Sequence, residues 1–245
     1  MSPRPLLIDA GWRLASLGGV VAAAALLLVP AAGLGWRGVA ATLAVYAAIG
    51  AFVLWALPQH APHRRFGAAN ALTLARAGYV ALLLGAVVEG VALAENLRWA
   101  LVLSGVLVLL LDGADGWAAR RTGLASPFGA RFDMEVDALF VLALTLLVVR
   151  SGAAGAWVMI AGLLRYLFVL AGLVWPMLGL PLPPSYRRKA VCVVLILALL
   201  AALAPPAVPG APWLCLGGLL LLVYSFAVDI VQLLEPDASR RGSLH

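Results

Sequence analysis

Four aspartates gather within 26 residues of a chain that contains only seven Asp. They are Asp112, Asp115, Asp133 and Asp137, and they directly follow the apolar run VLVLLL. The first two are three residues apart and the last two are four apart, so each pair shares one face of a helix. Ser126 before Pro127 is typical of a helix N-cap followed by proline at the first helical position. The spacing predicts two helices, joined by a short loop, that offer four carboxylates to one place.

Four carboxylates at one place repel one another, and an ionised group inside a membrane costs roughly 2.5–3.5 kcal/mol on insertion scales. Protonation, pairing with arginine or binding of divalent cations could each offset this cost. Divalent ions are the most economical answer, because hard oxygen ligands suit Mg²⁺, Mn²⁺ or Ca²⁺. The stretch has no His or Cys, which argues against zinc or copper. Two such ions would balance four negative charges and could clamp a phosphate group.

Small residues line one side of the first predicted helix, at Gly113, Ala114, Gly116, Ala118 and Ala119. A bulky polar ligand such as a nucleotide diphosphate could therefore approach the backbone there. Arg120 lies about one turn beyond Asp115 and could pair with phosphate oxygens. Together these residues favour a phosphate-containing substrate.

The pattern Asp112-x2-Asp115-Gly116-x2-Ala119-Arg120-x8-Gly129-x3-Asp133-x3-Asp137 resembles, without a gap, the signature of the CDP-alcohol phosphotransferases, also called CDP-alcohol phosphatidyltransferases. Eight positions are specified, each with an ordinary usage of about one in ten to one in twenty, so coincidence is negligible. The signature covers 26 residues, and the similarity in hydropathy covers roughly 66–235. The resemblance implies transfer of a substituted phosphate from a CDP-linked alcohol to a second alcohol, with release of CMP.

The resemblance also implies roles for individual residues. The metal ligands would be Asp112, Asp115, Asp133 and Asp137, holding two ions of Mg²⁺ or Mn²⁺ on the diphosphate. Asp137 would in addition be the base for the acceptor hydroxyl. The nucleotide-binding residues would be Gly116, Ala119, Arg120 and Gly129, of which the small ones make room for the cytidine nucleotide and the arginine helps to hold it.

The rest of the chain predicts membrane-spanning helices. Hydrophobic residues make up 64% of it and charged residues 11%, whereas a soluble domain carries roughly 25% charged residues. Apolar segments long enough to cross a bilayer can be drawn near 14–35, 38–58, 68–93, 99 onward, 127–149, 153–175, 190–204 and 213–234. We therefore expect an all-α polytopic membrane protein with about eight transmembrane helices. Six would form the core of the family and two would precede it.

The distribution of basic residues predicts how the chain crosses the membrane. Twelve of the seventeen Lys and Arg fall in alternate loops counted from the N-terminus, and three fall in the opposite loops. The positive-inside rule then places both termini and the four aspartates on the cytoplasmic side. The resemblance to the family further suggests the cell or inner membrane of a bacterium. We expect three regions: a two-helix membrane extension (1–65), the phosphotransferase core (66–235) and a polar tail (236–245).

Three polar residues of the third predicted span, Asn70, Thr73 and Arg76, lie at i, i+3 and i+6. Similar residues line the active site in the family that the signature resembles, so we consider all three as substrate-binding residues. An arginine within a span is a functional-site hypothesis by default. Snorkelling of Arg76 to the cytoplasmic interface explains it equally well.

Other cations could contact the acceptor. Arg165 lies in the middle of the sixth predicted span, where we favour binding of the acceptor's head group over a structural ion pair. Arg188 and Lys189 open the next span and could bind an anionic acceptor or a lipid phosphate, although a plain positive-inside anchor explains them at least as well. Glu89, Glu135 and Asp229 receive no role from the sequence.

We expect an integral-membrane transferase of phospholipid biosynthesis that moves a phosphatidyl group from CDP-diacylglycerol to a small alcohol, with a phosphorylated or anionic alcohol favoured. Transfer of the CDP-choline or CDP-ethanolamine type to a lipid alcohol is the alternative. A cation-binding membrane transporter is an alternative of another class, but it would not explain Gly116, Ala119, Arg120 and Gly129 at this spacing, and no inverted repeat is visible. The expected partners are the two substrates and the lipid bilayer. We expect no nucleic acid, and a homodimer is left open.

Overall fold

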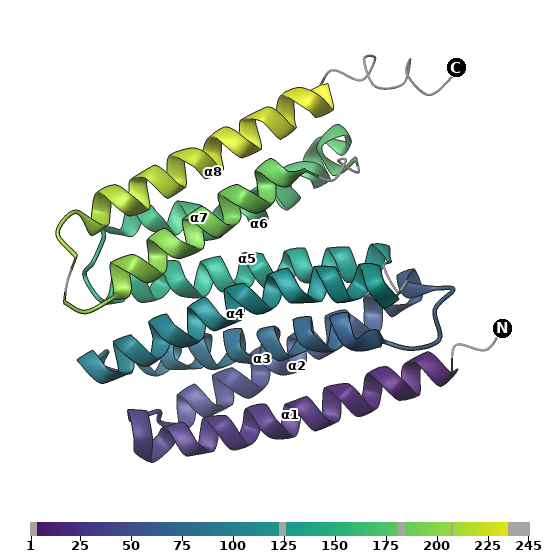
Figure 1. The fold of residues 1–245 in the computed structure, drawn as a ribbon, viewed down its shortest axis with the longest axis horizontal. Helices are drawn as coiled ribbons and strands as arrows, with labels where there is room; N and C mark the ends of the chain where they lie inside the picture. The colour runs from purple at the N-terminus through teal and green to yellow at the C-terminus, as the bar shows by residue number, and fades with distance from the viewer. Residues whose placement is uncertain (1–3, 123–125, 181–184, 207, 235–245) are drawn as a thin grey trace. The chain divides into compact units, whose positions relative to one another are not determined.

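The computed structural model describes residues 4–122, 126–180, 185–206 and 208–234, without the side chains of Arg4 and of residues 112–122. Eight α-helices and three short 3₁₀ helices, and no strand, occur in this part of the chain (Figure 1). They are α1 (Arg4–Ala32), α2 (Trp36–Ala56), η1 (Leu57–His60), α3 (Gly67–Glu89), α4 (Glu95–Thr122), α5 (Pro127–Arg150), η2 (Ala156–Val158), α6 (Met159–Val174), η3 (Pro176–Gly179), α7 (Tyr186–Leu203) and α8 (Ala211–Leu234). The all-α fold expected from the sequence is confirmed.

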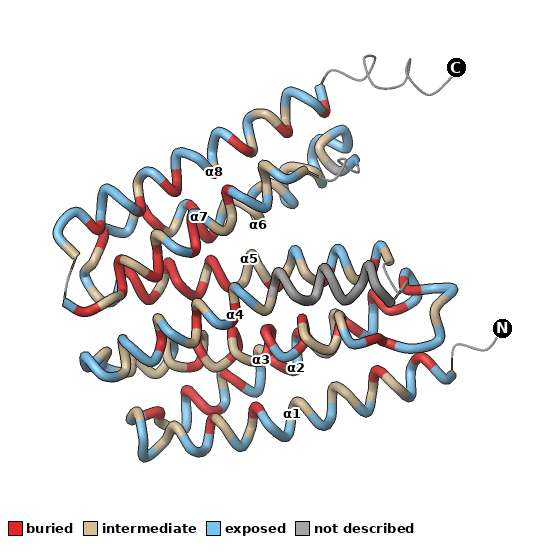
Figure 2. Tube along the Cα trace, in the orientation of Figure 1, coloured by how far each residue is buried: buried red, intermediate tan, exposed pale blue. Residues whose placement is uncertain are grey.

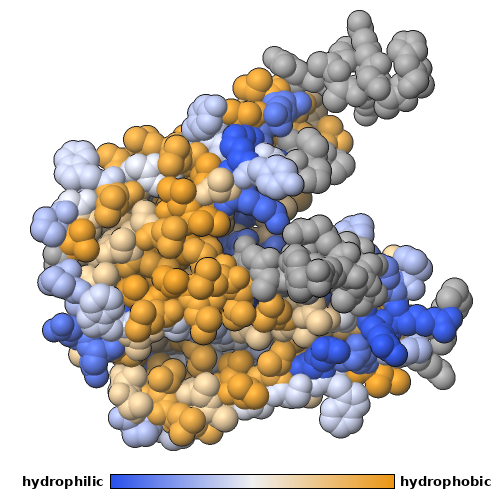
Figure 3. All heavy atoms as spheres, in the orientation of Figure 1, coloured by the Kyte–Doolittle hydropathy of each residue, from blue (hydrophilic) through white to orange (hydrophobic). Residues whose placement is uncertain are grey.

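Five segments of the described chain are long and apolar enough to cross a membrane: Pro5–Ala32, Trp36–His60, Gly67–Glu89, Ala156–Val174 and Ala211–Leu234. Helix α7 has only 18 residues, three of them the cations Arg187, Arg188 and Lys189. Helix α5 begins with the charged half of the signature. The visible surface is mostly hydrophobic, as lipid-facing helices require (Figure 3). The chain is a polytopic integral membrane protein.

The chain divides into two compact units, Met1–Ala143 and Leu144–His245, which we describe separately. The division falls within α5, so the part of this helix with Asp133 and Asp137 belongs to the first unit. It reflects packing and does not test the predicted regions 1–65, 66–235 and 236–245, which stay predictions. Residues 236–245 lie outside the described part of the chain.

In the first unit, α2 and α3 pack with their backbones in close approach. A Cβ atom added at Gly85 would lie 2.0 Å from Thr42 Oγ1, and one added at Gly38 would lie 3.0 Å from the carbonyl oxygen of Gly85. Small residues permit such an approach between membrane helices. Helix α3 is the most buried of the five candidate spans, and α1 has few buried positions (Figure 2).

Glu89, which had no role in the sequence, caps a neighbouring helix. It is the last residue of α3, and its Oε2 accepts a hydrogen bond of 2.7 Å from the amide of Gly38 in the first turn of α2. The first amides of a helix have no partner within the helix and carry partial positive charge. The carboxylate of Glu89 on α3 therefore supplies a hydrogen-bond acceptor for an amide in the N-terminal turn of α2.

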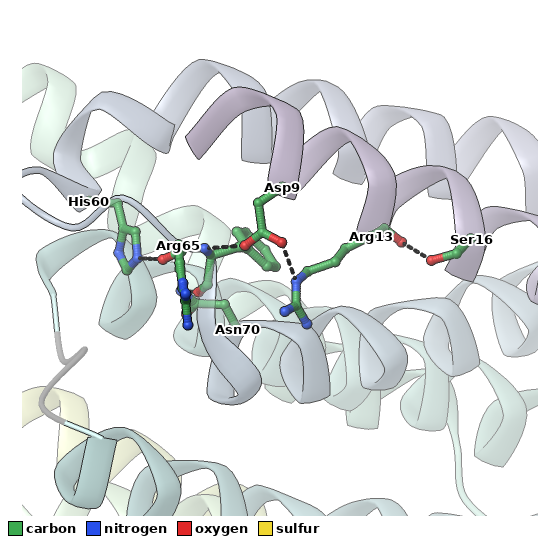
Figure 4. A network of polar contacts seen from close by, with 7 residues as sticks. Asp9, Arg13, Ser16, His60, Arg65 and Asn70 are labelled. Atoms are coloured by element: carbon green, nitrogen blue, oxygen red, sulfur yellow. Dashed lines mark hydrogen bonds and ion pairs between the residues drawn. The ribbon is translucent and has the colours of Figure 1, made fainter. Parts of the chain in front are cut away.

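At the opposite end of α3, the cap comes from α1. The amide of Phe66, the N-cap residue of α3, donates to Asp9 Oδ2 at 2.8 Å, and Arg13 Nε donates to Asp9 Oδ1 at 3.2 Å (Figure 4). Tyr46 of α2 donates to the carbonyl of Leu14 at 3.0 Å. The N-terminal helices are thus joined by polar contacts to each other and to the first helix of the core.

The second unit has its own polar cluster, where the start of α7 meets α8. Arg187 donates to the carbonyl oxygen of Ser225 at 2.6 Å and to the carboxylate of Asp229, and Arg188 Nη1 lies 3.3 Å from Asp229 Oδ1. Asp229 is 4% exposed. Two arginines therefore balance a buried carboxylate that the sequence left without a role.

We expect Asp9→Ala to lower the apparent melting temperature in detergent by about 2–4 °C, the shift for a loss of ~1 kcal/mol in a chain of this size. The amide of Phe66 would lose its acceptor. Asp9→Asn is the matched control, because it keeps an oxygen in the same place. An Ala variant as stable as the unmodified protein would contradict a stabilising role for this contact.

Candidate active site

Helix α5 begins as the sequence predicted. Ser126 Oγ accepts a hydrogen bond of 3.1 Å from the amide of Gly129, and the carbonyl of Ser126 accepts one of 3.1 Å from Ala130. Pro127 takes the first helical position, where its lack of an N–H has no cost. The predicted N-cap is confirmed, and it sets where the signature residues of α5 lie along the helix.

Asp133 and Asp137 are held by one side chain from α3. Arg76 Nη1 donates to Asp133 Oδ1 at 2.7 Å, and Arg76 Nη2 donates to Asp137 Oδ1. Arg76 is 2% exposed, whereas the carboxylate side chains are 28% and 25% exposed. Because one planar guanidinium meets both carboxylates, these two aspartates do share one face of α5.

Snorkelling of Arg76 to the cytoplasmic interface stays a prediction. The guanidinium itself is buried and pairs with both carboxylates of α5. It supplies a positive charge between two negative ones, which is the arginine pairing that the sequence left open beside protonation and metal binding. The mutual repulsion of the carboxylates is reduced, and each keeps an exposed fraction through which a substrate or ion could approach.

Asn70 and Thr73 lie on the same helix as Arg76, and both are buried. Asn70 Nδ2 donates to the carbonyl of Phe66 at 2.6 Å, and Thr73 Oγ1 donates to the carbonyl of Ala69 at 3.1 Å. The described hydrogen bonds therefore join both side chains to the preceding turn of α3. Their proposed contact with a substrate stays a prediction.

Gly129 has a packing role that the sequence did not reveal. A Cβ atom at this position would lie 2.8 Å from Asn70 Oδ1, closer than a real Cβ comes to another atom. The absent side chain thus makes room for the carboxamide of Asn70, and it lets α3 and α5 approach. The signature gives Gly129 but not its neighbour, so only the folded chain could identify this contact.

The other half of the signature lies in α4. Asp112, Asp115, Gly116, Ala119 and Arg120 all fall within this helix, as predicted, but their side chains lie outside the described residues. Among the described side chains no group of three or more His, Cys, Asp or Glu is assembled. The pair on α5 nonetheless fits Mg²⁺ or Mn²⁺ by the chemistry of its donors, which are two adjacent carboxylates with no competing nitrogen or sulfur ligand among them.

The remaining predicted residues belong to the second unit. Arg165 is half-buried in α6. Arg188 and Lys189 lie in the first turn of α7, where Arg188 contacts Asp229 and Lys189 is exposed. The sequence treated the basic run as an anchor or an anion site and missed its acidic partner on α8. The signal for this pairing was a lone acid in an apolar span, which requires a cation nearby.

These features define a polytopic helical membrane protein in which a buried arginine pairs with two carboxylates of one helix. The family model of CDP-alcohol phosphatidyltransferase matches residues 66–229, more than half of the chain, and the chain belongs to this family. The protein is accordingly a transferase of the phosphatidyl group from a CDP-alcohol to an alcohol. None of the curated proteins or solved structures with which the chain was compared gives a significant match.

We expect Arg76→Ala to lower the free energy of unfolding by about 1.5–3 kcal/mol, the range for hydrogen bonds to charged groups. Two neighbouring carboxylates would lose the charge between them. Arg76→Lys should fall between the Ala variant and the unmodified protein, because an ammonium keeps the charge but lacks the planar fork. Thermal unfolding in detergent with EDTA measures the difference. Equal melting temperatures for all three proteins would show that the pairing contributes no stability.

Proposed function

We propose that the protein transfers a phosphatidyl group from CDP-diacylglycerol to a small alcohol, with release of CMP, as a step of phospholipid biosynthesis. The observation that carries the proposal is the paired geometry of Asp133 and Asp137, fixed by buried Arg76 within the part of the chain that matches the family model. Family membership supports the reaction class. The apolar helices support a donor whose acyl chains stay in the bilayer.

In this proposal the acceptor hydroxyl gives its proton to the carboxylate of Asp137 while the hydroxyl oxygen attacks the phosphorus atom that carries the diacylglycerol. The bond from this phosphorus to the bridging oxygen breaks, and CMP leaves with that oxygen. Asp112, Asp115, Asp133 and Asp137 would hold two ions of Mg²⁺ or Mn²⁺. When bound, such ions would offset the charge on the diphosphate oxygens. Arg76 orients Asp133 and Asp137 toward one place and puts a positive charge beside both carboxylates.

The nucleotide would bind against the small residues of the signature. We assign Gly116, Ala119 and Arg120 of α4 and Gly129 of α5 to this role. Asn70 and Thr73 lie on the helix that carries Arg76, so a substrate that reached the aspartates would pass near them. Their amide and hydroxyl groups suit hydrogen bonds to a nucleotide or phosphate.

The acceptor would be an anionic or phosphorylated alcohol. Arg165, Arg188 and Lys189 supply cations in the second unit, and an arginine can hold a phosphate or carboxylate through two parallel hydrogen bonds. CDP-choline or CDP-ethanolamine with a lipid alcohol is the alternative substrate pair. An assay that offers both kinds of donor separates the two.

We also propose that the aspartates and both termini face the cytoplasm of a bacterial cell. Arg13, Arg64 and Arg65 lie at the end of the first unit where Asp9 meets the start of α3, whereas Arg37 opens α2 near Glu89 at the other end. The end with more arginines is cytoplasmic by the positive-inside rule. The regions 1–65, 66–235 and 236–245 remain our division of the chain, and a homodimer remains open.

The purified protein should release CMP and form a new lipid when it is supplied with CDP-diacylglycerol, Mg²⁺ or Mn²⁺ and the correct alcohol from a panel of anionic and neutral candidates. Mass spectrometry detects both products. We expect thorough EDTA treatment to abolish the reaction and added Mg²⁺ or Mn²⁺ to restore it. Activity that survives chelation would contradict the metal assignment, and product from CDP-choline alone would favour the alternative donor.

For Asp137→Asn we expect kcat to fall by about 10²–10⁴, the usual scale for general acid–base catalysis, while donor affinity remains measurable. The carboxamide cannot accept the hydroxyl proton, but it preserves the volume of the side chain. Initial rates give kcat, and binding of CDP-diacylglycerol is measured separately. An Asn variant with full activity would remove Asp137 from the chemistry.

Arg165→Lys should raise the KM of the acceptor strongly and leave the KM of the CDP donor nearly unchanged, because lysine keeps the charge but cannot form the two-pronged contact. Steady-state kinetics with each substrate varied in turn provides the measurement. A rise in the donor KM instead would assign Arg165 to the nucleotide site, and loss of folding would assign it to a structural ion pair.

A further inference from the structure

The N-terminal extension packs directly on the signature helix α5. Phe128 and Phe132 of α5 are fully buried and belong to one hydrophobic cluster with residues of α1, α2 and η1. The Phe132 ring lies 6.4 Å from that of Phe52, and the guanidinium carbon of Arg131 lies 5.3 Å from the ring centre of Trp55. The extension therefore covers the first two turns of the helix that carries Asp133 and Asp137.

His60, the last residue of η1, makes the most specific of these contacts. Its side chain is completely buried. Nε2 lies 2.9 Å from the carbonyl oxygen of Arg65, and Nδ1 lies 2.6 Å from Ser126 Oγ (Figure 4 shows the Arg65 side). A carbonyl can only accept, so Nε2 carries a proton. Nδ1 of the neutral ring then accepts the hydroxyl proton of Ser126.

The hydroxyl of Ser126 is at the same time the N-cap of α5. With its proton directed to His60, its oxygen is oriented to accept the amide of Gly129 at 3.1 Å. The ring of His60 also packs edge-on against Phe128, with centroids 5.5 Å apart. One imidazole thus fixes both the rotamer of the capping serine and the first buried aromatic residue of α5.

A shift of the backbone at the Ser126 cap also moves Asp133 and Asp137, because Ser126 caps the continuous helix that carries both aspartates. Asp133 lies seven residues beyond Ser126, which is about two turns or ~10 Å of helix. A change in the starting turn alters the rotation and height of the downstream carboxylates relative to Arg76. Close approach at Gly129 and Asn70 leaves little room for such a shift.

We propose that His60 is a positioning residue for the transferase reaction, acting through Ser126 to hold α5 where Asp133 and Asp137 meet Arg76. The two N-terminal helices are then part of the scaffold of the active site, although the match to the family model begins only at residue 66. The kinetic part of this inference rests on the proposed function. The structural part does not.

Two substitutions separate the contact made by Nδ1 of His60 from the contact made by Nε2. His60→Asn places an amide oxygen near the position of Nδ1, so it keeps the contact with Ser126 and loses that with Arg65. His60→Gln places its amide nitrogen near Nε2, so it keeps the contact with Arg65 and loses that with Ser126. If His60 only stabilised its own loop through Arg65, Gln would be the better substitute.

Hydrogen–deuterium exchange of the full-length protein in detergent or nanodiscs measures how well the first turns of α5 are protected. It does not require enzymatic activity. We expect faster exchange in a peptide covering 128–133 for His60→Gln, and protection close to the unmodified protein for His60→Asn. Equal exchange in the two variants, or faster exchange in Asn, would overturn the proposal. Absence of transferase activity in the unmodified protein would contradict the proposed function without affecting this measurement.

Kinetics then test the consequence for catalysis. We expect His60→Gln to lower kcat about 10-fold, within the range for loss of a supporting hydrogen bond at an active site, and His60→Asn to recover most of it. In a Ser126→Ala background, His60→Gln should have little further effect, because the two residues act in series. Additive losses in the double variant, or equal kcat for Asn and Gln, would overturn the positioning role.

Discussion

A buried guanidinium between two carboxylates of one helix is the interaction on which the first unit depends. Asp133 and Asp137 lie one turn apart, so without a cation their charges would oppose each other wherever the helix was placed. Arg76 resolves this from α3, and its reach fixes the distance and rotation between α3 and α5. Arg76 therefore has two effects: it offsets negative charge at the acidic pair, and it fixes the position of α5 relative to α3.

Close approach of the helices follows from that constraint. An arginine extended from α3 can meet both acids only if the two backbones lie near each other, and Gly129 allows this against Asn70. The aromatic residues at the start of α5 fill the space on the side of the extension, and the capping serine fixes the first turn. The polar and the apolar contacts of α5 thus favour the same position of this helix. Such agreement is expected of a sequence whose local preferences match its fold.

The sequence predicted the helices, the Ser126 cap and the shared face of Asp133 and Asp137, because each depends on spacing along a single helix. It did not predict the partners of Arg76, Glu89 or Asp229. These contacts join residues more than forty positions apart, and periodicity carries no information on which helix faces which. His60 was missed for the same reason, because its partner Ser126 lies 66 residues further along the chain.

The carboxylate of Glu89 at the start of α2 has a consequence for assembly. Helices α2 and α3 are neighbours in sequence, their backbones touch along the seam of Gly38, Thr42 and Gly85, and the last residue of one satisfies the first turn of the other. All of these packing and capping contacts lie within the hairpin of α2 and α3. The two helices can therefore associate as soon as both have entered the bilayer. The signature helices are synthesised later and would meet a preformed surface rather than a set of separate spans.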